Sequence, residues 1–321
     1  MRLWVLALLG VMTLGLAAWA GWRHVTAPPS LDAAARAALY AAPLSAPPGG
    51  MEVFHLGHSL VGRDMPAMVA QLAAAAGVAG HAYHSQLGWG TSLREHWDPD
   101  LPITGFAEEN DHPRHRDAHD ALAAGVDALI LTEMIDLADA IRYHRSPRYL
   151  AQWAREARAH TPEARVYLYE TWHHWSEGDA WLERLDRDPE DLWEGTILAQ
   201  AMAEEGVGTV HVIPGGRAMA AFVRALEGQG GLPGLEDRSA LFARDAAGEV
   251  DGIHLNDLGA YFIALVHVAT LYHLDPRGLP HSLQRADGTE AEAPSAQAAA
   301  LMQSVVHDTV RQIPSTGLPP T

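Results

Sequence analysis

The stretch MEVFHLGHSLVGRDMPAMVAQLAAAAG, residues 51–77, places a serine between an expected strand and an expected helix. The segment 51–57 predicts a strand, and DMPAMVAQLAAAAG at 64–77 predicts a helix that ends at Gly77. Ser59 therefore follows the carboxyl end of a strand, where ligands bind in open α/β sheets. For this serine alone, a turn or helix N-cap role is the simpler interpretation.

The same alternation of strand and helix continues along the chain. Further strands are expected at 81–88, 126–133, 164–170 and 209–214, and further helices at 115–125, 146–160, 189–206, 216–228 and 257–273. Short apolar strands alternating with helices predict a parallel sheet that is covered on both faces. The expected fold class is α/β, a three-layer α/β/α sandwich around a five-stranded parallel sheet. Its carboxyl edge would bring together Ser59, Gly88, Glu133 and Glu170.

Composition excludes several classes of protein. The chain has 321 residues and a formal net charge of −18, which argues against a nucleic-acid partner. It has no cysteine, so disulfides, thiolate nucleophiles and cysteine-based zinc sites are excluded.

The stretch EENDHPRHRDAHD at 108–120 is rich in His and Asp, but its spacing matches no closed metal motif and its arginines would repel a cation. We interpret it as a solvated loop and expect no metal and no cofactor.

The N-terminus indicates export. The uncharged run LWVLALLGVMTLGLAAWAGW at 3–22 has a small-x-small site at 18–20, as in a secretory signal peptide. About 20 apolar residues also suffice for a membrane-anchoring transmembrane helix. Both alternatives predict an extracytoplasmic location, periplasmic or secreted. The expected organisation is a signal or anchor at 1–26, a Pro/Ala-rich linker at 27–50, one folded domain at 51–282 and a tail at 283–321 with a helix near 294–312.

A nucleophilic serine needs a base, and the base needs an orienting carboxylate. The nucleophile-elbow pattern G-x-S-x-G fails here, because Gly62 comes one place late. Later in the chain, VDGIHLNDLGAYF at 250–262 places Asp251 and His254 three residues apart, before a long helix. In a loop, this spacing lets the Asp251 carboxylate reach one imidazole nitrogen while the other faces outward. Asp257 competes for the same orienting role.

With these residues the sequence resembles the SGNH hydrolases, the GDSL-type esterases and lipases. Gly57-His58-Ser59-Leu60 is similar to the first family block, with His in place of Asp, and Asp251-Gly252-Ile253-His254-Leu255 is similar to the last. The resemblance implies a flavodoxin-like sandwich and a serine esterase with Ser59 as nucleophile, His254 as base and Asp251 as orienter. It also implies an oxyanion hole made by the Ser59 N–H and the N–H of Gly88 or Gly90.

The third family block departs from the pattern. The family places an oxyanion-binding Asn after the third strand, but LILTEMIDL at 129–137 offers Thr132 or Glu133 there. An ionised Glu133 cannot donate a hydrogen bond, so it would have to be protonated, turn away or bind a substrate hydroxyl. The candidate replacements for the missing donor are His58, Trp89 and Asn256.

The aromatic stretch ETWHHWSEGDAW at 170–181 follows the fourth strand. It is either a packed loop or an aromatic wall, led by Trp172, for a sugar ring or acyl group. Tyr143 and His144 are further candidates for that wall.

The expected function is an exported esterase acting on small-molecule or carbohydrate esters. The alternatives are an O-acyltransferase with the same triad and a non-catalytic glycan- or envelope-binding module, and the oligomeric state is left open.

Overall fold

The computed structural model describes residues 28–175 and 179–320, and its centre is a five-stranded parallel sheet in the order β2-β1-β3-β4-β5. The strands are β1 Glu52–His58, β2 Ala82–Gly88, β3 Ala128–Leu131, β4 Arg165–Glu170 and β5 Val210–Pro214. Each lies within or beside the range expected from the sequence. The predicted α/β fold class with a five-stranded parallel sheet is therefore confirmed.

Strand β1 occupies the interior of the sheet and sets the position of Ser59. It pairs with β2 from Glu52↔Ala82 to His58↔Gly88 and with β3 from Val53↔Ala128 to Leu56↔Leu131. Its side chains are buried on both faces, as the helix-covered strands of a parallel sheet require. The carboxyl ends of β1 and β2 consequently meet at one edge, with Ser59 directly beyond β1.

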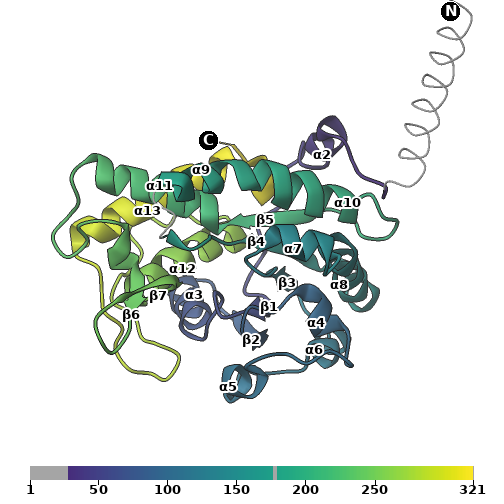
Figure 1. Ribbon diagram of the computed structural model, residues 1–321, viewed down its shortest axis with the longest axis horizontal. Helices are drawn as coiled ribbons and strands as arrows, with labels where there is room; N and C mark the ends of the chain where they lie inside the picture. Colours follow the sequence, from purple (N-terminus) through teal and green to yellow (C-terminus); the bar gives the residue numbers. More distant parts are fainter. Residues whose placement is uncertain (1–27, 176–178, 321) are drawn as a thin grey trace, which may run out of the picture.

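Helices cover both faces of the sheet, and each face has its own apolar core (Figure 1). One core is formed with α3 Asp64–Ala75, α11 Gly215–Gly228, α12 Asp257–Tyr272 and α13 Ala296–Gln312. The other is formed with α4 Leu93–Trp97, α6 Ala118–Ala124, α7 Leu137–Arg142 and α8 Ser146–His160. Alternate residues of the strands enter the two cores, because successive strand side chains point to opposite faces.

The helix expected at 189–206 differs from the one observed. The segment Pro189–Leu198 is a π-helix, preceded by α9 Asp179–Asp188 and followed by the short α10 Ala199–Ala201. The wider turn is possible because Gly195 has no side chain: a Cβ there would lie 2.1 Å from the Glu190 carbonyl oxygen. Periodicity in the sequence does not distinguish such a turn from an ordinary α-helix.

A two-stranded antiparallel hairpin, β6 Phe242–Arg244 and β7 Val250–Leu255, was not expected. Asp251 and His254 lie on β7, so their expected placement in a loop is corrected. The Asn256 side-chain amide donates to the carbonyls of Ala240 (2.9 Å) and Phe242 (3.2 Å), which attaches the end of β7 to β6. The Asn256 contact adds to the pairing of the two strands. In the sequence, the short strand segments show no clear alternation of apolar residues.

The segments that flank the central domain lie against it. The Tyr40 hydroxyl, just after α2 Ala33–Leu39, donates to the Val210 carbonyl at 2.7 Å. The Leu44 N–H donates to the Gly317 carbonyl at 2.8 Å, which joins the two ends of the described chain. Helix α13 packs on α11 and α12. Residues 28–50 and the tail are therefore in contact with the body of the protein.

The prediction of a transmembrane helix is corrected. Within residues 28–175 and 179–320, no helix combines the length and apolar character needed to cross a membrane. The run at 3–22 on which that prediction rested lies outside the described residues, as does the proposed cleavage site. Export stays a prediction from the sequence.

Candidate active site

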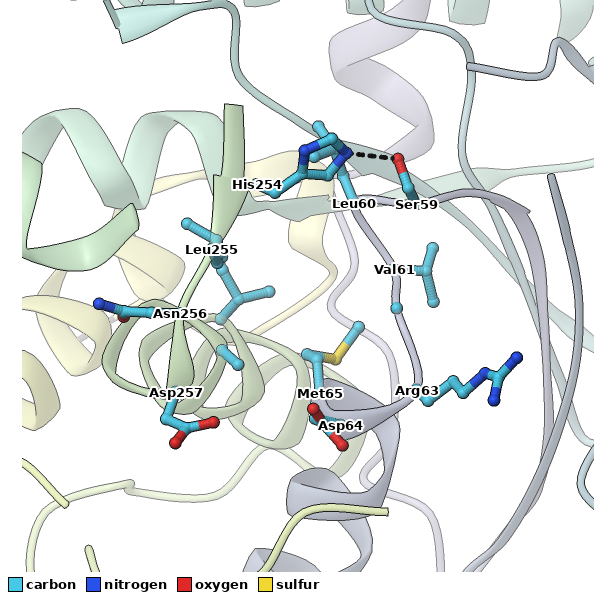
Figure 2. A pocket seen from close by; sticks show the side chains of 13 residues that line it. Ser59, Leu60, Val61, Arg63, Asp64, Met65, His254, Leu255, Asn256 and Asp257 are labelled. Atoms are coloured by element: carbon cyan, nitrogen blue, oxygen red, sulfur yellow. Dashed lines mark hydrogen bonds between the residues drawn. The ribbon is translucent and has the colours of Figure 1, made fainter. Parts of the chain in front are cut away.

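A chain of hydrogen bonds joins three residues that are far apart in the sequence. Ser59 Oγ lies 3.0 Å from His254 Nε2, and His254 Nδ1 lies 2.9 Å from Asp251 Oδ2. Figure 2 shows the first of these bonds, with the serine in the turn after β1 and the histidine on β7. In the neutral tautomer that fits both contacts, Nδ1–H donates to the carboxylate and Nε2 accepts from the serine hydroxyl.

The carboxylate of Asp251 is oriented by its own strand. Its Oδ1 accepts hydrogen bonds from the backbone N–H groups of Ile253 (2.8 Å) and His254 (2.9 Å). Partial burial would raise the pKa of Asp251, but these donors and the His254 ring outweigh it and hold the pKa below its usual value. Asp257, the competing orienter, is instead paired with Arg285 at 2.5 Å.

The aromatic stretch after β4 supports the hairpin instead of forming an aromatic wall. Trp172 is fully buried, and its Nε1 donates to the Ile253 carbonyl at 2.8 Å. Trp175 Nε1 donates to the Asp251 carbonyl at 3.2 Å. The expectation that Trp172 lines the substrate cavity is therefore wrong, because its apolar ring lies in the core and its N–H is used to hold β7.

Ser59 and His254 lie between two hollows. The smaller, about 140 Å³, extends toward the start of α3 and α12, and Figure 2 shows the carboxylates of Asp64 and Asp257 at its far end. The larger is a cavity of about 460 Å³ that we call the main cavity. Its lining residues are His58, Ser59, Leu60, Gly62, Trp89, Gly90, Glu109, Ile135, Ile253 and His254.

The two candidate glycines differ in position. A Cβ at Gly88 would lie 2.2 Å from Thr91 Oγ1 and 2.3 Å from Ile103 Cγ2, so this residue is packed into the fold. Gly90 lines the main cavity together with Ser59, and a Cβ there would meet nothing within 4 Å. Its φ of 59° lies in the left-handed region that favours glycine. The structure places Gly90, not Gly88, on the cavity.

Glu133 turns away from the site, which was one of the three alternatives for it. It is fully buried and lines neither hollow, so its assignment to the oxyanion or substrate site is corrected. Its Oε1 accepts from the backbone N–H of Met134 at 2.8 Å and of Leu93 at 3.3 Å. Burial raises the pKa of Glu133 to about 7 despite these donors. The carboxyl group therefore ties the loop after β3 to the start of α4.

The candidate replacements for the missing donor already use their N–H groups within the protein. His58 Nε2 donates to the Glu133 carbonyl at 2.8 Å, and burial lowers the pKa of His58 to about 4, so the ring stays neutral. The Asn256 amide is held by the β6 segment, and its Oδ1 caps α12 by accepting from Gly259 N–H. Trp89 Nε1 donates to Glu109 Oε1 at 2.9 Å.

His96 also contributes to the site and was not identified from the sequence. It is buried, and its Nε2 donates to the Gly57 carbonyl at 2.7 Å, two residues before Ser59. The other ring nitrogen, Nδ1, accepts a hydrogen bond from the Gln86 side-chain amide at 3.0 Å. No local pattern signals this contact, because the two residues lie 39 positions apart. Tyr143 and His144, both expected near the site, line neither hollow.

No metal centre accompanies this geometry in the part of the chain that the structure describes. Within residues 28–175 and 179–320, no three His, Asp or Glu side chains are arranged to hold a metal ion.

No family model and no curated protein matches this chain. Two solved structures are similar to it. One is described as a GDSL-like lipase from Parabacteroides merdae, with 13% identity and a TM-score of 0.40 over 68% of this chain and 94% of that chain. The other is a carbohydrate esterase family 3 protein from Talaromyces cellulolyticus, with 20% identity and a TM-score of 0.33 over 69% of this chain and 96% of that chain.

Both identities are below 25% and both TM-scores are below 0.5, so neither likeness shows what this chain does.

Proposed function

We propose that this protein is a serine esterase that hydrolyses carboxylic esters through an acyl-enzyme. One observation carries the proposal: the unbroken hydrogen-bond chain from Ser59 through His254 to Asp251 opens onto the main cavity. Serine is a weak nucleophile unless an adjacent base accepts its proton, and a base in this arrangement has its tautomer set by the carboxylate.

The proposed reaction has two similar steps. Ser59 Oγ attacks the ester carbonyl while His254 Nε2 takes its proton, and the resulting imidazolium is stabilised by the Asp251 carboxylate. His254 then protonates the departing alcohol, which leaves the acyl group on Ser59. A water molecule, deprotonated by the same nitrogen, attacks the acyl-enzyme and releases the acid and the free serine.

The proposed oxyanion site consists of backbone donors. The N–H groups of Ser59 and Gly90 are the candidates, since both residues border the main cavity. The side-chain N–H groups of His58, Trp89 and Asn256 have protein acceptors, so none of them is proposed as a third donor. Losing one oxyanion donor typically costs about 10²–10³ in rate. We therefore expect modest turnover on simple esters.

Substitution of the serine tests the proposal. Ser59→Ala should lower kcat/KM on p-nitrophenyl acetate by at least about 10³-fold and abolish labelling by a fluorophosphonate probe. Ser282→Ala is the matched control, because this exposed serine lies outside both hollows. Full activity of Ser59→Ala, or probe labelling at another residue, would show that the assignment is wrong.

A further inference from the structure

We propose that Trp89 and Glu109 form a subsite for a neutral sugar ring, so that the ester hydrolysed is an acyl group on a carbohydrate. This inference rests on the proposed esterase function and specifies its substrate class. It depends on the way the exposed indole is held at the main cavity.

Trp89 is an exposed tryptophan whose position is set from several directions. Its side chain is 50% exposed, whereas Trp153, Trp172 and Trp181 are fully buried. Its backbone N–H donates to the Thr104 carbonyl at 2.8 Å. The indole N–H donates to Glu109 Oε1 at 2.9 Å. A large apolar side chain held in this way loses little conformational entropy when a ligand binds to it.

One face of the indole lies on backbone. A Cβ at Gly105 would lie 2.2 Å from Trp89 Cδ2 and 2.4 Å from Cε2, so the ring fits there only because this residue is glycine. Gly105 has a φ of 67° and precedes α5 Phe106–Asn110, the short helix that carries Glu109. With one face covered and half of the side chain still exposed, the opposite face of the ring remains for a ligand.

The proposed sugar subsite and the pair Ser59 and His254 lie in the main cavity together. Trp89 and Glu109 line the main cavity with Ser59 and His254, while Ile135 and Ile253 supply apolar lining. Its volume of about 460 Å³ lies in the range of sites for small molecules. A ring bound against Trp89 would therefore be in the same cavity as the nucleophile that attacks its ester group.

The pairing of a flat apolar surface with a carboxylate matches a pyranose. A sugar ring has a face of C–H groups that packs on an aromatic ring, and its rim of hydroxyls donates to carboxylate oxygens. An acyl chain has no donor for the second oxygen of this carboxylate, whose Oε1 already accepts from the Trp89 indole N–H. A quaternary ammonium group favours a cage of several aromatic rings, but among the described lining residues Trp89 is the one Trp, Tyr or Phe.

The test compares a sugar ester with an ester that has no ring. For methyl 6-O-acetyl-glucopyranoside, Trp89→Ala should lower kcat/KM about tenfold, mainly through KM, and Trp89→Phe should lose less. For ethyl acetate, which has no ring to pack on the indole, the same variants should lose clearly less, so that the ratio of kcat/KM for the sugar ester to kcat/KM for ethyl acetate falls several-fold. Tyr143→Ala is the matched control, since this aromatic side chain is 55% exposed and lies outside the cavity.

Three results would overturn the subsite: an equal loss on both esters, no loss on either, or a larger loss on acetylcholine than on the sugar ester. Calorimetric titration of Ser59→Ala with the sugar ester separates this inference from the esterase proposal. Binding that weakens about tenfold in Ser59→Ala/Trp89→Ala supports the subsite even if the wild type hydrolyses nothing, and unchanged binding removes it even if hydrolysis is confirmed.

Discussion

Trp172 Nε1 donates a hydrogen bond of 2.8 Å to the carbonyl of Ile253, the residue before His254. The indole is fully buried, so strand β7 is attached to the core directly beside His254, the proposed base. The His254 side chain itself is half exposed. Its position therefore depends on the residues that hold its backbone.

Trp172→Phe should test this positioning role. The variant keeps an aromatic ring but loses the hydrogen bond to Ile253, so kcat should fall about tenfold while KM stays nearly constant. The free energy of unfolding should fall by about 1–3 kcal/mol, which urea titration measures. Trp193→Phe, in the core of the opposite face, is the control for lost ring volume. An equal loss of kcat in that control would mean that Trp172 acts only through stability.

Asp251→Asn should show how far activity depends on the orientation of the His254 imidazole. The variant keeps this ring and removes only the carboxylate that orients it. The amide cannot hold the Nδ1–H tautomer that the carboxylate favours, so kcat should fall by about 10⁴-fold with little change in KM. Asp275→Asn, at an exposed ion pair with Arg277, should retain wild-type activity. A decrease of less than tenfold in Asp251→Asn would indicate that another group orients His254.

Glu133 should make stability depend on pH in a defined direction. Burial raises its pKa from 4.5 to about 7, so between these values the folded chain binds more protons than the unfolded chain. The stability contributed by the protonated carboxyl is complete below the unfolded pKa and is lost as the pH rises through the folded pKa. Relative to wild type, Glu133→Gln should therefore gain free energy of unfolding between pH 5 and pH 8.

Urea unfolding of both proteins at the two pH values measures this difference. Glu170 also has a pKa raised to about 7 by burial, but it is present in both proteins and cancels in the comparison. Glu290→Gln provides the control, because that side chain lies on the surface. A constant gap between wild type and Glu133→Gln across the two pH values would contradict the burial argument.

The parts of the site that could be predicted are those with local signals. The apolar segment before Ser59 predicted β1, and the spacing of Asp251 and His254 places both on one short segment, as the structure has them. The parts that could not be predicted depend on contacts between distant segments. Nothing near Trp172 indicates that its N–H would meet Ile253, 81 positions later.

The choice between the two glycines illustrates the same division. The sequence offers Gly88 and Gly90 equally, but strand pairing between His58 and Gly88 and packing by Ile103 place Gly88 inside the fold. Glu133 shows the same division. A glutamate after a strand suggests a polar role at the sheet edge, but here the side chain points inward, where its carboxylate accepts hydrogen bonds from two backbone N–H groups.

By itself, the sequence determined the parallel α/β sheet, the position of Ser59 after the first strand and the local pairing of Asp251 with His254, because periodicity and short spacing act within one segment. Tertiary structure alone decided that Ser59 and His254 meet, although 195 positions separate them. It also decided that Trp89, not Trp172, borders the cavity. Burial and hydrogen-bond partners for these side chains come from other segments, so they exist only once the chain has folded.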